Sequence, residues 1–288
     1  MTMYIAAYDT EGPGCLEGVR EIVKVHEKWA MPATFFLVAR LLDEHEAEYK
    51  ALLGDNPLFE VACHTYTHMP LVDTPRYGKA GPVERYGREL VESKKRIEDV
   101  FGRAVIGFRP PVSAPDGLTT APEALRVLSE AGYRYVSSVA WGPDYSLPAP
   151  LTRPFTYAEQ GFPKMWELPP CGWHENLLKG NNKIGPVLLL LFPQPMPEAV
   201  PTDYVKTPEE EFRYNGKPFL DRGIADGMPQ VSFVWHPWSL HAFDPAMAMI
   251  DMTFDYVRAQ ALEWGTFADL LARLDAVRGA DTEACAWR

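Results

Sequence analysis

The chain has 288 residues and carries 39 Asp and Glu against 28 Lys and Arg side chains, a formal net charge of −11. With 47% hydrophobic residues, its composition is that of an ordinary globular protein and argues against disorder. The charge disfavours nucleic acid and anionic membrane surfaces as partners, because binding to phosphate requires clustered Lys and Arg side chains.

The first half of the chain alternates short apolar runs with segments of helical periodicity. The runs predict strands at 4–8, 34–38, 58–62, 105–108 and 133–136. The periodic segments between them predict helices at 16–29, 41–53, 83–101 and 121–131. Strands covered on both faces become short apolar runs, so this alternation predicts βα units around a parallel sheet. Right-handed crossovers would wind that sheet into a doubly wound fold or a barrel.

The pattern weakens at residues 142–227, which are rich in proline and isolated aromatic residues. Proline removes a donor and restricts φ, so this region is predicted to be an ordered loop or lid with a few short elements. Regular elements return after it, with a strand at 231–235 and helices at 245–262 and 267–277. Because no internal repeat or low-complexity linker appears, residues 1–288 are interpreted as one domain with a loop-rich insertion at 142–227.

Targeting and redox signals favour a cytoplasmic protein. The N-terminal residues show no basic segment followed by an apolar core, and the longest apolar run, Val187–Phe192, is far shorter than the ~20 residues of a membrane helix. The four cysteines are scattered without a CxxC pair, which favours reduced thiols. Cys63 adjoins His64 but is interpreted as a strand residue because its other neighbours are apolar.

Two groups of polar residues follow predicted strands in the first half. Asp9 and Glu11 come directly after the first strand, where carboxylates are well placed to meet a ligand, although an acidic helix-capping turn is an equal alternative. His64 and His68 follow the third strand. Imidazoles four residues apart share one face of a helical turn and can bind one cation, unless both are core histidines.

Two further segments carry candidate catalytic groups. His236 lies between Trp235 and Trp238 at the end of a late strand, where walls of low polarity can tune its pKa for acid–base chemistry. A structural histidine is the alternative. Arg109 precedes two prolines that restrict its loop, and its guanidinium offers a fork to a carboxylate. An ordinary surface salt bridge is the alternative there.

These motifs, taken in order from about Tyr4 to Leu274, resemble those of the NodB-like polysaccharide deacetylases, carbohydrate esterase family 4. The resemblance implies an α/β fold, a distorted (β/α) barrel with an insertion in its second half, and a metal site at the carboxyl ends of the strands. It also implies one divalent metal ion, for which zinc is the default with two imidazoles and a carboxylate, while cobalt and nickel are compatible.

The resemblance assigns a role to each matching residue. His64 and His68 match the two histidine ligands of the metal. Asp9 matches the general base, Arg109 the arginine that orients this base, and His236 the general acid. Every role that amide hydrolysis requires therefore has a candidate in this sequence.

The sequence departs from the family pattern in three places. Thr10 stands where the family has a second aspartate, with Glu11 one place further on, so either Asp9 or Glu11 is the carboxylate ligand; Glu11 is taken as the candidate. Val112 replaces an aromatic residue whose backbone N–H serves the oxyanion hole, and a backbone donor survives that change. The segment before Trp141 lacks the aspartate that tunes the catalytic residues of the family.

Aromatic residues near these motifs are candidates for substrate binding. Trp141, Trp166, Trp173 and Trp238 offer flat faces of the kind that stack on sugar rings. Tryptophans also line hydrophobic cores, which is the alternative for each.

Three functions are compatible with the motifs. The first is metal-dependent hydrolysis of a C–N amide bond, with removal of the acetyl group from an N-acetylated carbohydrate or small glycan. The second is hydrolysis of a small cyclic imide, amide or ureide, or a deformylation, which suits a cytoplasmic location. The third is a catalytically inactive barrel that binds carbohydrate, which the altered first motif allows. Oligomerisation is left open, with the run 187–192 as a possible interface.

Overall fold

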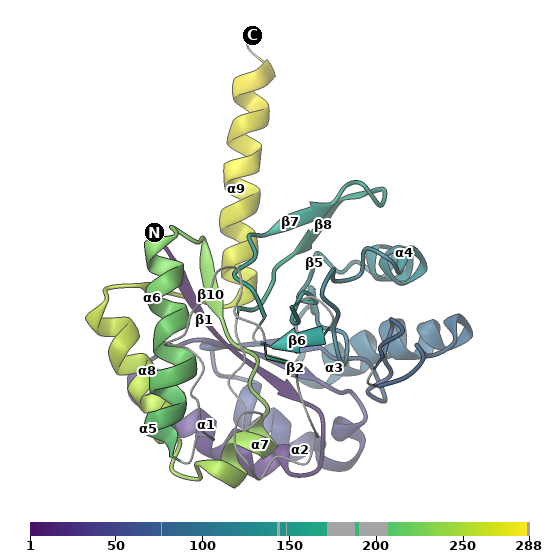
Figure 1. Ribbon diagram of the computed structural model, residues 1–288. Coiled ribbons are helices and arrows are strands. Elements are labelled where there is room, and N and C mark those ends of the chain that lie inside the picture. Colours follow the sequence, from purple (N-terminus) through teal and green to yellow (C-terminus); the bar gives the residue numbers. More distant parts are fainter. Residues whose placement is uncertain (76, 143–144, 148, 172–187, 190–206, 287–288) are drawn as a thin grey trace.

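The computed structural model describes residues 1–75, 77–142, 145–147, 149–171, 188–189 and 207–286 (Figure 1). The first half of the chain contains β1 (Met3–Thr10), α1 (Cys15–Trp29), β2 (Ala33–Leu37), α2 (Leu41–Leu53), β3 (Phe59–Cys63), α3 (Ser93–Phe101), β4 (Gly107–Phe108), α4 (Pro122–Glu130) and β5 (Tyr135–Val136). The second half contains β6 (Ser146–Leu147), β7 (Phe155–Tyr157), β8 (Phe162–Glu167), β9 (Leu188–Leu189), α5 (Pro208–Glu211), α6 (Lys217–Ala225), β10 (Gln230–Ser232), α7 (Pro237–Phe243), α8 (Ala248–Ala259), β11 (Glu263–Trp264) and α9 (Phe267–Ala286).

The main sheet has the strand order β10-β1-β2-β3-β4-β5-β8-β7, and β11 also pairs with β1. Among its described strands, β7 and β8 form the antiparallel pair and the other neighbours run parallel. Within the described residues the hydrogen-bonded order ends at β10 and β7 and does not close into a ring. The predicted α/β fold with a parallel sheet is confirmed, and a parallel sheet brings the carboxyl ends of its strands to one edge.

Both faces of the sheet are covered, which explains why β1 and β2 are buried along their whole length. Alternate residues of β1 belong to two different cores. Tyr4, Ala6 and Tyr8 pack in the larger core together with α1, while Ile5 and Ala7 belong to a smaller one with Phe267 and other residues of α9. The start of α9 therefore covers one face of the sheet, and its later turns project away from the rest of the chain (Figure 1).

One predicted helix has a different geometry in the structure, and one helix was not predicted. The segment 83–101 is not one α-helix but a 3-10 turn at Val83–Arg85, a π-helix at Gly87–Glu92 and then α3. The predicted helix at 245–262 is present as α8, at Ala248–Ala259, whereas the separate helix α7 before it was not predicted. Pro237 lies in the first turn of α7. Backbone N–H groups in a first turn have no acceptor within the helix, so proline removes no helical hydrogen bond there and is typical of a helix start.

The described parts of the region 142–227 contain several short elements. The hairpin of β7 and β8 extends the sheet next to β5, and α5, a π-helix at Phe212–Gly216 and α6 follow one another at 208–225. Pro208 and Pro218 lie in the first turns of α5 and α6, where proline is compatible with a helix. Strands from both sides of this region share one sheet. The single-domain interpretation itself stays a prediction.

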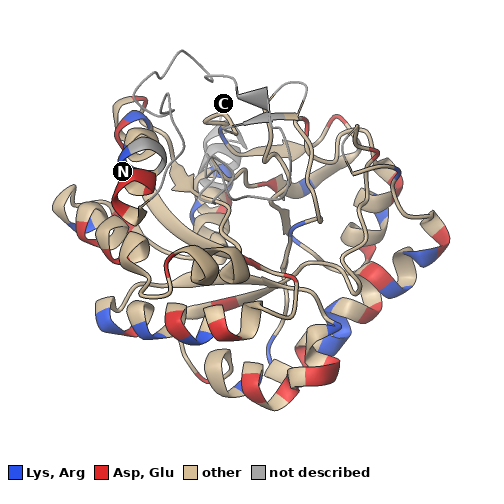
Figure 2. Cartoon of the chain, turned by 60° about the horizontal axis from the view of Figure 1, so that its bottom comes forward, with Lys and Arg blue, Asp and Glu red and all other residues tan. Residues whose placement is uncertain are grey.

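Charged side chains of both signs alternate along the outer helices, whereas the strands carry few of them (Figure 2). Many are paired one helical turn apart, for example Lys95 with Asp99 at 2.6 Å and Arg126 with Glu130 at 2.6 Å. Among the helices that the structure describes, none is both long enough and apolar enough to cross a membrane.

Candidate active site

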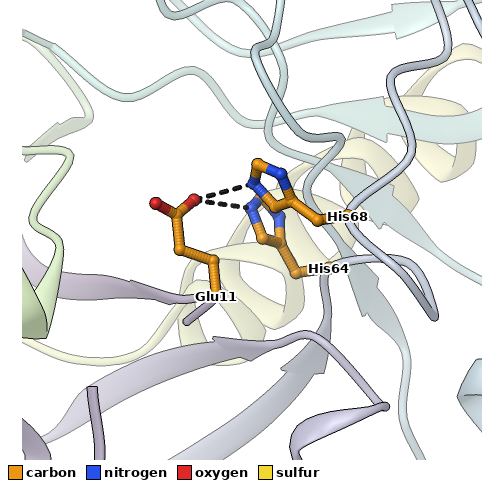
Figure 3. A group of neighbouring side chains, drawn as sticks. All are labelled: Glu11, His64 and His68. Carbon is orange, nitrogen blue, oxygen red and sulfur yellow. Dashed lines mark ion pairs between the residues drawn. The ribbon is translucent and has the colours of Figure 1, made fainter. Parts of the chain in front are cut away.

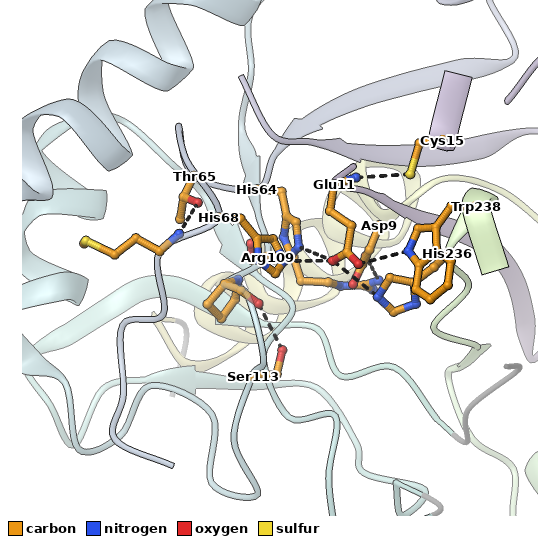
Figure 4. Close-up of polar contacts among 12 residues, drawn as sticks. Asp9, Glu11, Cys15, His64, Thr65, His68, Arg109, Ser113, His236 and Trp238 are labelled. Carbon is orange, nitrogen blue, oxygen red and sulfur yellow. Dashed lines mark hydrogen bonds and ion pairs between the residues drawn. The ribbon is translucent and has the colours of Figure 1, made fainter. Parts of the chain in front are cut away.

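The carboxyl ends of four parallel strands bring the predicted residues together. Asp9 lies at the end of β1 and Glu11 follows it, His64 follows β3, and Arg109 follows β4. His236 comes just before α7, in a segment whose Trp235 forms a bridge with β1. Residues far apart in sequence thus share one edge of the sheet (Figure 4).

Glu11, His64 and His68 form a compact group of potential metal ligands (Figure 3). Their ligand atoms all lie within 4.8 Å of one another. Oε2 of Glu11 is 2.7 Å from Nε2 of His68 and 3.8 Å from Nε2 of His64. Two imidazole nitrogens and one carboxylate are a donor set that suits zinc and similar divalent ions.

The tautomer of His64 and the position of His68 also fit a cation. Nδ1 of the buried His64 lies 2.7 Å from the carbonyl oxygen of Arg109, and a carbonyl can only accept, so Nδ1 carries the proton and donates it. Nε2 of a neutral His64 is then free to bind a metal, the arrangement found in many metal sites. The buried Nε2 of His68 faces Oε2 of Glu11 at 2.7 Å and has no other partner among the residues that the structure describes. These atoms fit a divalent ion.

The loop that carries the two histidines is not the helical turn that their spacing predicts. Thr65 and His68 adopt left-handed conformations, with φ of 65° and 67°, which are uncommon for residues with a Cβ. The fully buried Glu89 holds this loop from the π-helix. Its carboxylate accepts from the backbone N–H groups of Tyr66 and Thr67 at 3.0 and 2.8 Å and from the Thr67 hydroxyl at 2.8 Å. Strained backbone of this kind persists only where its surroundings hold it.

Asp9 is held by Arg109 rather than by the histidines. Nη1 of Arg109 donates to Oδ1 of Asp9 at 2.7 Å, and Nη2 donates to the hydroxyl of Ser137 at 3.0 Å. The guanidinium is fully buried and lies 4.1 Å from the centre of the Phe36 ring. The predicted pairing of Arg109 with a carboxylate is thus present in the structure, and it separates Asp9 from Glu11: one carboxylate faces an arginine and the other faces the two imidazoles.

His236 approaches Glu11 from the other side, with Nε2 at 3.5 Å from Oε2. Burial lowers the pKa of His236, but the charges of Glu11 and Asp9 outweigh it and raise that pKa above its usual value. Burial raises the pKa of Glu11, but the charge of His236 and the hydrogen bonds of the three surrounding histidines together outweigh it and hold that pKa well below its usual range. The indole Nε1 of Trp238 donates to the other oxygen of Glu11, Oε1, at 3.1 Å.

Comparison with known proteins agrees with this geometry. Residues 8–136, which include most of these groups, match the sequence model of the family described as polysaccharide deacetylase. Over this segment the chain is similar to the polysaccharide deacetylases, so the predicted likeness to that family is confirmed. No curated protein matches the chain.

Solved structures share the deacetylase fold at low sequence identity. The Puue allantoinase has a TM-score of 0.64 and 14% identity over 96% of this chain and 90% of its own. A peptidoglycan N-acetylglucosamine deacetylase has a TM-score of 0.54 and 12% identity, over 93% of this chain and 87% of its own. A CE4 family pseudoenzyme from Bacillus anthracis has a TM-score of 0.54 and 16% identity, over 94% of this chain and 66% of its own. At such identities the likeness shows the fold alone.

One cavity of about 160 Å³ collects most of the predicted site residues. It is lined by Asp9, Glu11, His64, His68, Val112, Trp141, His236 and Trp238, together with Tyr77, Ser113, Ala140 and Val234. Val112 and Ser113 have φ of 68° and 51°, and the indole of Trp141 donates to the Val112 carbonyl at 2.5 Å. Trp141 therefore fixes the loop that presents the Val112 N–H.

One of the predicted tryptophans that the structure describes is not part of this cavity. Trp166 lies on β8, where its indole donates to Asp275 of α9 at 2.9 Å, so it packs between sheet and helix instead of lining the cavity. Trp173 lies outside the described residues. Sequence reasoning also missed Tyr77 and Ser113, which line the cavity, because neither belongs to a motif; the position of Ser113 next to Val112 was the one available signal.

Proposed function

We propose that the protein is a metal-dependent hydrolase of a non-peptide C–N amide bond that removes the acetyl group from an N-acetylated carbohydrate or small glycan. The observation that carries this proposal is the convergence of Glu11, His64 and His68 beside the buried pair of Asp9 and Arg109 in one cavity. The family description, polysaccharide deacetylase, supports the same chemistry.

Each chemical requirement of amide hydrolysis has a group in the cavity. Asp9 accepts the proton of the attacking water, and the hydrogen bond from Arg109 orients this carboxylate. The backbone N–H of Val112 donates to the oxyanion, which a well-placed donor stabilises by about 3 kcal/mol. His236 delivers a proton to the departing nitrogen. A divalent ion held by the remaining carboxylate and the two imidazoles would supply Lewis-acid polarisation of the amide and lower the pKa of water.

Metal content and acetate release test this proposal. The purified protein is expected to contain about one divalent ion, with zinc proposed ahead of cobalt and nickel, and to release acetate from N-acetylglucosamine oligomers. His64→Ala should lose the ion and the activity, whereas Asp9→Asn should lose the activity and keep the ion. His45→Ala, at the surface of α2, is the control for removing an imidazole. Full activity in the metal-free protein would overturn the mechanism.

A second substrate class is supported by the size of the cavity. Its volume of about 160 Å³ is below the roughly 300–1,000 Å³ of sites for drug-sized ligands, and a small cyclic imide, amide or ureide would fit it. The likeness to an allantoinase fits this alternative. Incubation with a panel of cyclic imides and ureides beside the sugar oligomers separates the two classes. A protein that binds the metal but hydrolyses neither class is the inactive carbohydrate-binding form.

We also propose that the enzyme works in the reducing cytoplasm. Three of its four cysteines, Cys15, Cys63 and Cys171, are described and are free and buried. Buried free thiols need no oxidising compartment to fold.

A further inference from the structure

The two oxygens of Glu11 have different partners. Oε2 faces the imidazoles of His64 and His68, while Oε1 accepts the indole N–H of Trp238 at 3.1 Å (Figure 4). Trp238 comes from the first turn of α7 and is 36% exposed. It therefore contacts the proposed ligand carboxylate directly, besides bordering the cavity.

A glutamate in this place needs such a partner more than an aspartate does. Glu11 stands one residue beyond the family position of the ligand aspartate, which Thr10 occupies here, and its side chain has one more rotatable bond. An unrestrained carboxylate loses rotamer entropy when it binds a cation, and a hydrogen bond formed in advance reduces that loss. The N–H of Trp238 restrains one oxygen and leaves the other directed at the histidines.

Trp238 is itself held by close packing between α7 and α1. A Cβ added to Gly18 would lie 2.2 Å from the carbonyl oxygen of Pro237, and one added to Gly14 would lie 3.1 Å from the Cβ of Trp238. Gly18 of α1 therefore allows the backbone of α7 to lie this close, and Gly14, the residue before α1, leaves room for the Cβ of Trp238. The start of the Trp238 side chain is thus held by close packing against this end of α1.

We propose that Trp238 is a positioning residue of the metal site, whose indole N–H holds Oε1 of Glu11 so that Oε2 faces His64 and His68. The inference rests on the proposed metal-dependent function. It replaces the interpretation of Trp238 as a stacking surface alone with a role in metal affinity.

The test compares Trp238→Phe, which keeps the aromatic wall and removes the N–H, with Trp264→Phe as the matched control. Trp264 is 39% exposed and pairs with Tyr4 at the other end of β1. Affinity for Zn²⁺ is measured by competition with a chromophoric chelator, the Co²⁺ absorption spectrum reports ligand geometry, and thermal unfolding of the metal-free proteins reports the fold.

Trp238→Phe should bind Zn²⁺ about 10-fold more weakly, the smallest loss typical of removing a partner of a metal ligand, and should alter the Co²⁺ spectrum. The metal-free melting temperature should stay the same, and Trp264→Phe should match the wild type. In a Glu11→Ala background the added Trp238→Phe change should have no further effect on affinity, because its partner is gone. Should Trp238→Phe not fold, Trp238→Leu removes the same N–H.

Zn²⁺ affinity within twofold of the wild type in Trp238→Phe, with or without a raised KM, overturns the positioning role and leaves Trp238 as a wall of the cavity. A wild-type protein that binds no divalent ion overturns the proposed function instead. The two failures are therefore distinguishable in one set of titrations.

Discussion

Protonation of His26 is expected to destabilise the fold as the pH falls from about 6.5 towards 4. This side chain is fully buried, and burial lowers its pKa from 6.5 to about 4. Nδ1 lies 2.6 Å from the carbonyl oxygen of Met31 and must donate to it, and Nε2 lies 2.7 Å from the Tyr8 hydroxyl and accepts from it. A second proton on Nε2 would remove its acceptor lone pair, so the Tyr8 hydroxyl could no longer donate to it, and would place a charge in the core.

The magnitude follows from the difference between the folded and unfolded pKa. Below pH 6.5 the unfolded chain binds a proton that the folded chain does not, so the free energy of unfolding falls by up to 1.36 kcal/mol per pH unit. Over the interval down to about pH 4 the loss sums to about 3 kcal/mol. The contribution is fully present above pH 6.5 and is lost as the pH falls through the folded pKa.

Urea unfolding of the wild type and of His26→Gln at pH 7, 6, 5 and 4 measures this effect. Glutamine can still donate to Met31 and accept from Tyr8, but it does not titrate. The wild type should be the more stable at pH 7, and the gap should shrink by about 3 kcal/mol at pH 4. His45→Gln, which removes an imidazole from the surface of α2, is the control. If the free energies of unfolding of the wild type and His26→Gln change in parallel between pH 7 and pH 4, the reasoning is refuted.

Three further predictions concern residues that shape the site. Glu89→Gln should weaken Zn²⁺ binding about 10-fold in chelator competition, since its carboxylate holds the histidine loop; unchanged affinity would contradict this. Arg109→Met leaves Asp9 buried without its cation and should lower the free energy of urea unfolding by about 3–5 kcal/mol; a loss below 1 kcal/mol would count against it. Gly18→Ala should cost about 1–3 kcal/mol in the same assay, because its Cβ meets the first residue of α7, whereas Gly87→Ala, with open space around it, should cost less.

Local patterns predicted the first half of the fold closely. The strands β1, β2 and β3 and the helices α1 and α2 lie within two residues of their predicted ends, because each buries one face or both and so carries a clear period. The segment 83–101 shows where this fails. Its helical period is real, but Glu89 belongs to a π-helix that a 3.6-residue pattern does not distinguish.

The sequence predicted which residues gather at the candidate site, but it predicted their geometry only in part. The motifs identified His64, His68, Arg109 and His236, which the structure brings to one edge of the sheet. The spacing of the two histidines suggested a helical turn, yet the loop is strained and depends on Glu89, more than 20 residues further along the chain. No local pattern reports such a contact.

The sequence by itself determined the kinds of groups present and the parallel sheet that collects them, because strand ends follow from local periodicity and chemistry follows from side-chain type. Only the tertiary structure decided which partner each carboxylate has. Arg109 arrives from β4 to pair with Asp9, which leaves Glu11 to the imidazoles. It also turned Trp238 towards Glu11 and Trp166 towards α9. Such assignments depend on distances between residues far apart in the chain, and those distances are set by packing.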